Sequence, residues 1–207
     1  MAKVLSLLRG EISGKIGDKV YYQLNGRTVV RNMPAKTKWT PTAKQAKAQQ
    51  RFKSIIHYCR KFKNSVIPLV WDKLPDSWSG WSLFLKTNAP AFDPDGVPGD
   101  VCLLQLSMGK LTLPLEFTAH RKAGDPSVIE VSWKKNLSLG GVLLWDELMA
   151  VSAANDEYSS IISTGIKRGD LGGSFLLPAL KAPATHLFLF FASNDRNNFS
   201  NSVCFEI

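Results

Sequence analysis

The residues that could carry chemistry are few and lie far apart in the sequence. The three histidines, His57, His120 and His186, have no second histidine, cysteine or carboxylate at the spacing of metal ligands. A metal site would have to be assembled wholly by the fold, and we expect none. Cys59 and Cys204 lie in apolar patterns, where a buried structural thiol is the usual arrangement. A Cys–His nucleophile has no support in the local sequence, and we expect no cofactor.

Two further patterns that can mark active sites are also better explained by structure. The glycine-rich stretch 165–173 has neither the dinucleotide-binding nor the P-loop spacing. Its Arg168–Asp170 tripeptide matches an integrin-binding sequence but lies between two β-like runs, so we expect a turn. The adjacent carboxylates Asp146–Glu147 and Asp156–Glu157 would point to opposite faces of a strand, unlike a general acid–base pair. We therefore predict that the protein is not an enzyme.

Positive charge is concentrated in the first half of the chain. The net charge is +9, from 26 Lys and Arg residues against 17 Asp and Glu. Residues 1–92 contain 17 basic and 4 acidic residues, a net of +13, whereas residues 93–207 contain 9 and 13, a net of −4. No acidic residue lies between 27 and 63. The basic half could face nucleic acid, an acidic protein surface or the negative part of an identical neighbour.

Seven of these cations are the candidate contacts for a polyanion or a protein partner: Arg27, Arg31, Lys36, Lys38, Lys44, Lys47 and Arg51. At about 100° per residue, Lys44, Lys47 and Arg51 share one face of a helix, while Lys53 and Arg60 point to another. This scatter argues against a helix that reads a DNA groove, and no zinc-finger, helix-turn-helix or RNA-recognition signature accompanies it. Sequence-nonspecific nucleic-acid binding by an accessory protein is the alternative function.

The N-terminal forty residues are predicted to form a β-hairpin with little core of its own. Asn25–Gly26 separates two β-branched and aromatic runs, 19–23 and 27–31. An Asn-Gly pair in that setting is a strong signal for a two-residue turn. Because a two-stranded hairpin is marginal in water, it must dock on the rest of the chain or on another subunit.

A kinked helical segment follows the hairpin. Thr42 and Gln45 have the spacing of a capping box, and apolar positions recur every three or four residues from Phe52 to Ile67. Pro68 should kink or end this helix. A shorter helix should restart at 75–77 and close at Asn88. Trp71, Trp78 and Trp81 are candidate interface aromatics, since Trp is enriched where interfaces concentrate energy. The alternative is an ordinary core between the helices.

Strand-like runs alternate with turn signals after residue 100. The expected strands are 101–106, 115–120, 127–133, 148–153, 159–164, 174–177, 186–192 and 201–207. The run 187–191 has no polar alternate, so it should be a central strand buried on both sides. The fold class is therefore α+β, with an antiparallel β-sandwich of the fibronectin type III or immunoglobulin-like kind. We expect domains at 1–92 and 101–207, joined by a linker at 93–100.

Cysteine usage and apolar runs indicate the compartment. Cys59, Cys102 and Cys204 are odd in number and widely spaced, which argues against a disulfide framework and for a reducing compartment. No apolar run is long enough to span a bilayer, and Arg9 interrupts the N-terminal run too early for a secretory signal. We expect cytoplasmic synthesis, with a virion as a further location, and no membrane contact.

Motifs within residues 10–92 resemble a family of uncharacterised bacterial and prophage proteins. The matching residues are Ser13–Gly17, Asn25–Arg31, Pro34, Thr40–Pro41, Gln45, Gln49–Phe52, Ser79–Trp81 and Phe84–Asn88. A hairpin followed by a Thr-Pro-x-x-x-Gln…Gln-Arg-Phe helix is also similar to small predicted structural proteins encoded among phage virion genes. This chain departs from them by its full β-domain and its many cations.

The resemblance implies a subunit that packs by its hairpin and basic helix against a larger assembly. Together with the residue patterns, it predicts a non-enzymatic structural or assembly protein of a phage-like virion. The basic N-terminal half would anchor it, and the β-domain would be presented or packed between subunits. Its partners would be copies of itself or other structural subunits, with nucleic acid as the alternative partner. A carbohydrate- or ligand-binding β-sandwich is a third function, which would need exposed aromatics on the C-terminal domain.

Overall fold

The chain divides into two compact units, residues 1–42 and 43–207. The computed structural model describes residues 13–24, 27–35, 40–74, 78–135 and 143–207. The sequence predicted the boundary at 93–100, but these residues lie inside the second unit. The difference arises because the apolar side of the helices is buried against the C-terminal strands, so that helices and strands share a core.

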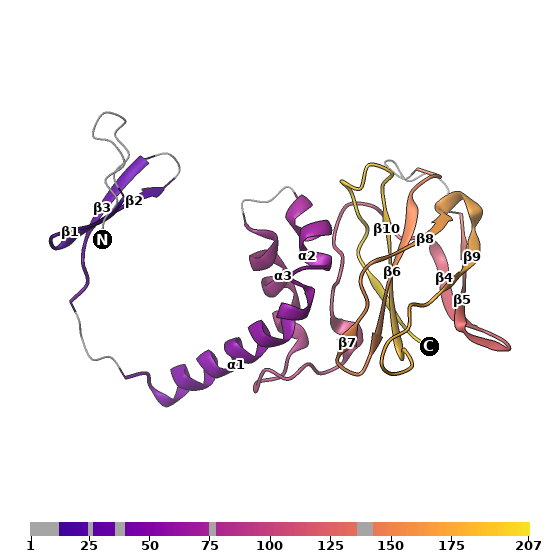
Figure 1. Ribbon diagram of the computed structural model, residues 1–207, viewed down its shortest axis with the longest axis horizontal. Helices are drawn as coiled ribbons and strands as arrows, with labels where there is room; N and C mark the ends of the chain where they lie inside the picture. Colours follow the sequence, from indigo (N-terminus) through magenta and orange to yellow (C-terminus); the bar gives the residue numbers. More distant parts are fainter. Residues whose placement is uncertain (1–12, 25–26, 36–39, 75–77, 136–142) are drawn as a thin grey trace. The chain divides into compact units, whose positions relative to one another are not determined.

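The first unit is a three-stranded antiparallel sheet in the order β1 (Gly14–Ile16), β2 (Lys19–Leu24) and β3 (Arg27–Asn32) (Figure 1). Pairing of Leu24 with Arg27 confirms the predicted hairpin, whose turn residues lie outside the described ranges. Strand β1 was not predicted. It pairs with β2 through a tight turn in which Gly17 has φ +60°, a conformation that favours glycine.

Helices make up the first half of the second unit. They are α1 (Ala43–Cys59), η1 (Arg60–Phe62), α2 (Val66–Leu69), η2 (Trp71–Lys73), α3 (Gly80–Asn88), η3 (Ala89–Ala91) and η4 (Val101–Leu103). The end of α3 at Asn88 is confirmed. The prediction that one helix continues to Pro68 is wrong, because α1 ends at Cys59 and Pro68 lies within α2. Among the described residues, no helix is long and apolar enough to cross a membrane.

Antiparallel strands make up the second half, as predicted. They are β4 (Leu115–Lys122), β5 (Asp125–Lys134), β6 (Glu147–Ala154), β7 (Glu157–Tyr158), β8 (Ile162–Lys167), β9 (Gly172–Leu176), β10 (His186–Ala192) and β11 (Val203–Glu206), with η5 (Arg168–Asp170) between β8 and β9. One sheet has the order β11-β10-β6-β7, with β8 also paired to β6, and the other has the order β4-β5-β9. The predicted strand at 101–106 is wrong: it begins as helix η4, whose Cys102 amide donates to the Asp100 carboxylate at 2.8 Å.

Strand β10 is a central strand of the five-stranded sheet (Figure 1). Its residues 187–192 are buried and contribute to two hydrophobic cores, which confirms that it is buried on both sides. Phe188 and Phe190 face the helices, in a core that includes Phe62 and Phe84. The alternate residues of β10 face the second sheet and pack with side chains of β5 and β9. Successive side chains of β10 point to opposite faces of its sheet, and those from 187 to 191 are all apolar. The strand therefore packs against the helices on one face and against the three-stranded sheet on the other, so that all three form one unit.

A disulfide joins Cys102 of η4 to Cys204 of β11, with the two Cα atoms 5.1 Å apart. The prediction against a disulfide is wrong, because a sequence separation of 102 residues says nothing about distance in the fold. Cys59 is the remaining, unpaired cysteine and is buried in α1. The cysteine count therefore gives no argument for a reducing compartment.

Candidate interaction surfaces

The N-terminal sheet carries two of the predicted cations, and none of residues 13–24 and 27–35 is buried. Residues directly opposite in an antiparallel pair point to the same face, so the register of the two ladders defines each face. One, which we call the basic face, consists of Lys15, Val20, Tyr22, Leu24, Arg27, Val29 and Arg31. The Arg31 guanidinium lies 5.7 Å from the centre of the Tyr22 ring, a cation–π contact.

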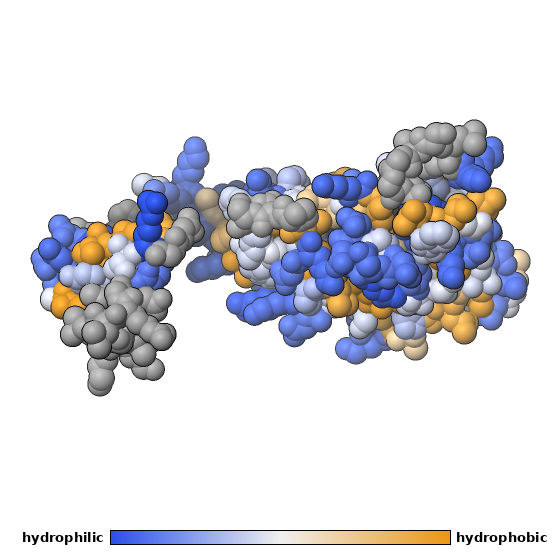
Figure 2. Space-filling model, turned by 90° about the horizontal axis from the view of Figure 1, so that it is seen from above, coloured by the Kyte–Doolittle hydropathy of each residue, from blue (hydrophilic) through white to orange (hydrophobic). Residues whose placement is uncertain are grey.

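The opposite face of the same sheet is also partly apolar. It contains Ile16, Tyr21 and Val30, and Val30 is 47% exposed. On the basic face Leu24 is 54% exposed. Figure 2 shows hydrophobic side chains at the surface of this unit beside hydrophilic ones. Within the described residues, the sheet therefore has apolar groups on both faces and no core of its own.

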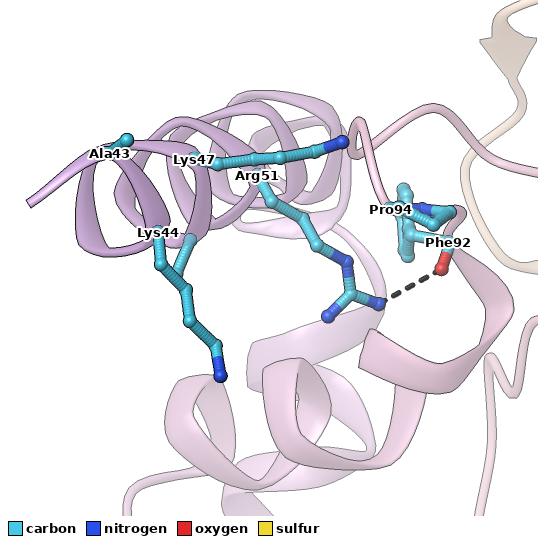
Figure 3. Close-up of a pocket in the computed structure, with 7 residues that line it drawn as sticks. Ala43, Lys44, Lys47, Arg51, Phe92 and Pro94 are labelled. Carbon is cyan, nitrogen blue, oxygen red and sulfur yellow. Dashed lines mark hydrogen bonds between the residues drawn. The ribbon is translucent and has the colours of Figure 1, made fainter.

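Arg51 of α1, a predicted contact for a partner, is instead committed to the protein's own backbone. Its Nη2 donates to the carbonyl of Phe92 at 2.9 Å (Figure 3) and to that of Ala89 at 3.1 Å, and its Nε donates to the carbonyl of Asp93 at 2.8 Å. These carbonyls lie at and just beyond η3, where a helical end leaves acceptors unsatisfied. Arg51 therefore fastens α1 to the segment after α3 and is not a free cation.

Lys44 and Lys47 line an open groove of about 630 Å³ together with Arg51, Phe92 and Pro94 (Figure 3). Lys47 also pairs with Asp95 at 3.5 Å. Of the seven predicted cations, these three meet at one groove, while Arg27 and Arg31 share the basic face of the first unit. Lys36 and Lys38 lie outside the described residues.

The three candidate tryptophans have different surroundings. Trp71 is 1% exposed and its indole N–H donates to the Leu106 carbonyl at 2.8 Å, so it is a core residue and its prediction as an interface aromatic is wrong. Trp81 is partly buried against the same core. Trp78 is 55% exposed and contacts the Lys86 ammonium, 5.2 Å from the ring centre. A helical stripe of aromatics does not reveal which member faces solvent.

A second concave surface was missed by the sequence analysis, and we call it the outer groove. It has a volume of about 730 Å³ and lies between the C-terminal half of α1, η1, the 96–98 loop and Asp156. Lys53, His57, Arg60 and Lys61 line it. Their spacing from 53 to 60 is a helical stripe, and this is the signal that could have identified the outer groove.

A tyrosine pair lies at the base of the outer groove, where α1 meets β7. The hydroxyls of Tyr58 and Tyr158 are hydrogen-bonded at 2.5 Å, and the Lys61 ammonium lies 4.0 Å from the centre of the Tyr58 ring. Lys61 also pairs with Asp156 at 3.2 Å. Burial raises the pKa of both tyrosine hydroxyls above the ordinary value of 10.0.

The residues considered for catalysis are not brought together. His120 pairs with Glu130 at 3.5 Å, and the His186 ring is hydrogen-bonded to the Thr185 hydroxyl. Burial raises the pKa of the Cys59 thiol to about 12, so this thiol is a poor nucleophile near neutral pH. Within the described ranges no group of three or more His, Cys, Asp or Glu side chains could hold a metal ion.

The Arg168–Asp170 tripeptide forms the single helical turn η5, in line with the predicted turn. Arg168 is 5% exposed, lies 4.0 Å from the centre of the Phe191 ring and pairs with the fully buried Asp146 at 3.5 Å. Burial raises the pKa of the Asp146 carboxyl, an effect that Arg168 opposes. Next to this pair, the side chains of Leu143–Trp145 are exposed.

Comparison of the chain with protein-family models, with curated proteins and with solved structures gives no match. The resemblance to prophage proteins therefore stays a prediction from the motifs in residues 10–92. The surfaces described above carry the functional argument.

Proposed function

We propose that the chain is a non-enzymatic structural protein of a phage-like virion, anchored by its basic N-terminal half to copies of itself or to other structural subunits. The observation that carries the proposal is the N-terminal sheet. None of its described residues is buried, although it has β-branched and aromatic side chains on both faces. Because burial of apolar surface is the main force that stabilises a sheet, this unit needs a partner surface to cover it.

The second unit supplies the part that is presented. Its two antiparallel sheets form a β-sandwich of the fibronectin type III or immunoglobulin-like kind. The proposal is supported by the core in which Ile129, Val131 and Trp133 of β5 pack with alternate residues of β10. The disulfide joins η4 to β11 and does not bridge the two sheets, which differs from the arrangement in antibody domains.

The assignment to a virion is supported by the hairpin and Thr-Pro-x-x-x-Gln motif in residues 10–92. The virion assignment also predicts the neighbouring genes, which can be checked without purified protein: genes for capsid, portal or tail proteins should adjoin the gene for this chain. Neighbouring genes for cellular metabolism would contradict the virion assignment and leave the assembly role to be judged by the experiment below.

The assembly role is tested by the oligomeric state of the full chain, measured by sedimentation velocity and native mass spectrometry over a wide range of concentration. We expect an oligomer or a stable complex with another subunit. Leu24→Ser together with Val30→Ser should dissociate it, because both side chains are exposed apolar groups of the N-terminal sheet. Amide hydrogen exchange of residues 13–35 should be slow in the assembly and fast in the variant.

Leu176→Ser is the matched control. Leu176 is 66% exposed on β9, at the edge of a sheet in the second unit, so the substitution removes exposed apolar area of the same kind. It should leave the assembly intact. A monomer at every concentration that also retains no partner in pull-downs, or equal dissociation by both substitutions, would overturn the proposed anchor.

A further inference from the structure

We propose that the outer groove binds the phosphodiester backbone of a nucleic acid strand, without sequence preference. This site lies in the second unit, whereas the anchoring surface proposed above is the N-terminal sheet, and it is lined by Lys53, His57, Arg60 and Lys61. Two of the seven polyanion contacts predicted from the sequence are already engaged within the chain, since Arg51 is bonded to backbone carbonyls and Lys47 is paired with Asp95.

Positive charge converges on the concave surface of the outer groove. Lys53, His57 and Arg60 are exposed, and no ion pair joins them to any described residue. With a rise of about 1.5 Å per helical residue, they are spaced about 6 and 4.5 Å apart along the axis. Lys53 and Arg60, with the His57 ring between them, can therefore contact neighbouring phosphates of a strand that runs along α1.

The 96–98 loop forms the wall of the outer groove beside α1. Gly96 has φ +82°, and a Cβ there would lie 2.7 Å from both the Arg51 carbonyl oxygen and Ser54 Cβ, so this loop packs directly on α1. The Asp93 carboxylate accepts from the amides of Asp95 (2.9 Å) and Val97 (2.8 Å), which fixes the turn. The bond from Val97 is the main reason that the pKa of Asp93 is lowered. The groove is thus preformed and needs little ordering on binding.

The side chains that line the outer groove favour a nucleic acid over an acidic protein as its partner. Protein partners gain most of their affinity from aromatic anchors that become buried. Here the Tyr58 side chain is already buried, beneath the Lys61 ammonium, and bonded to Tyr158. Besides the apolar side chains of Ile56, Val97 and Pro98, the groove offers cations and polar donors such as Gln50 and Ser54. That set fits phosphate contacts, which position a strand but do not read its sequence.

Asp156 provides the sharpest test, because it is the only acid among the described residues that line the groove. Its carboxylate, 78% exposed, holds the Lys61 ammonium at 3.2 Å. Asp156→Asn removes a charge that repels phosphate and releases Lys61 to bind it. We expect this substitution to raise affinity several-fold, a gain that damage to the fold would not produce.

The experiment measures binding of the full chain to fluorescently labelled random single-stranded and duplex DNA by anisotropy, across a salt series. For Lys53→Gln with Arg60→Gln, the slope of log affinity against log salt should become shallower by about 1.4–1.8, because two phosphate contacts are lost at about 0.7–0.9 each. The matched control, Lys110→Gln with Lys135→Gln, removes the same charge from exposed positions of the second unit and should keep the parent slope.

Three results would overturn the proposal: no binding by the parent chain at low salt, equal loss of slope in both double variants, or no gain from Asp156→Asn. Binding of polyglutamate in place of DNA, with the same dependence on Lys53 and Arg60, would assign the groove to an acidic protein. None of these results depends on the oligomeric state, so they leave the assembly role to its own experiment.

Discussion

Strand β3 of the N-terminal sheet and strand β10 of the second unit both carry apolar side chains on their two faces, yet they have opposite surroundings. Val30 is 47% exposed, whereas Phe190 is fully buried. In β10 apolar residues occupy every position from 187 to 191, and each face meets a different core. In β3 the apolar residues are the consecutive Val29 and Val30, which point to opposite faces, and neither is buried by a described residue.

The contrast shows that apolar content alone does not indicate which part of this chain is self-sufficient. The second unit surrounds β10 with helices on one side and a sheet on the other. Among its described residues the first unit has three short strands, and none of their residues is buried. The free energy that stabilises each unit should therefore come from different sources: internal packing for the second, and association for the first.

The largest expected difference in unfolding free energy is between truncation of a core side chain of the second unit and truncation of an exposed side chain of the N-terminal sheet. Phe190→Ala should cost about 3–5 kcal/mol of unfolding free energy, because it leaves a cavity in the core between helices and sheet. Val30→Ala should change the unfolding of the second unit by less than about 0.5 kcal/mol, since exposed substitutions rarely do more. Urea denaturation followed by tryptophan fluorescence measures both, as Trp71 and Trp133 are buried in the second unit.

Equal lowering of the urea midpoint of the second unit by Val30→Ala and by Phe190→Ala would contradict this comparison. Such a result would mean that the N-terminal sheet contributes to the core of the second unit. The proposal of an intermolecular anchor would then lose its physical basis.

The disulfide accounts for the next largest effect. Cys102→Ser, or reduction of the parent chain, should lower the unfolding free energy by about 2–4 kcal/mol, because the bond restricts the unfolded chain over a long loop. Cys59→Ser is the control: it removes a buried thiol but no cross-link. A parent chain whose stability is the same with and without reductant, and whose Cys102 reacts with an alkylating agent before reduction, would contradict this pairing.

Arg51 should matter less than the disulfide but more than a surface lysine. Arg51→Lys loses the fork that bonds three carbonyls, and we expect a cost of about 1.5–3 kcal/mol. Lys44→Gln, an exposed position on the same helix, should leave the midpoint unchanged. If instead the two substitutions have equal effects on thermal unfolding, Arg51 is a surface cation and its predicted role in partner binding regains support.

The sequence was sufficient where local patterns decide the structure. The Asn-Gly hairpin, the end of α3 at Asn88 and the fully buried β10 all follow from turn chemistry and residue alternation over a few positions. The coarse fold, α+β with antiparallel sheets, follows in the same way.

The sequence was insufficient where distant segments meet. The carbonyls that bind Arg51 lie about forty residues further on, and Cys204 lies 102 residues from Cys102. Trp71 is buried because its indole reaches Leu106 across the core. The outer groove likewise needs the 96–98 loop and Asp156 beside α1. Each of these depends on tertiary contacts, about which periodicity along one helix carries no information.

The smallest effect concerns the buried Asp146–Arg168 pair of the second unit. None of the described residues 13–24 and 27–35 of the first unit is buried. Burial raises the pKa of the Asp146 carboxyl above its ordinary value of 3.8, although the Leu143 amide and Arg168 favour the ionised form. The folded state then binds this proton more tightly than the unfolded state. The stabilisation is present in full below pH 3.8 and is lost as the pH rises through the raised pKa.

The measurement is the difference in unfolding free energy between the parent chain and Asp146→Asn, determined by denaturation at a series of pH values. Asn keeps the oxygen that accepts from Leu143 but never ionises. The parent chain should lose stability relative to the variant as the pH rises from just above 3.8. Asp93, Asp125 and Asp195 have lowered pKa values, so their contributions to the unfolding free energy are lost as the pH falls. These contributions are the same in both proteins and cancel in the difference. A difference that instead moves in favour of the parent chain with rising pH would mean that Arg168 outweighs burial, and that the ion pair stabilises this core.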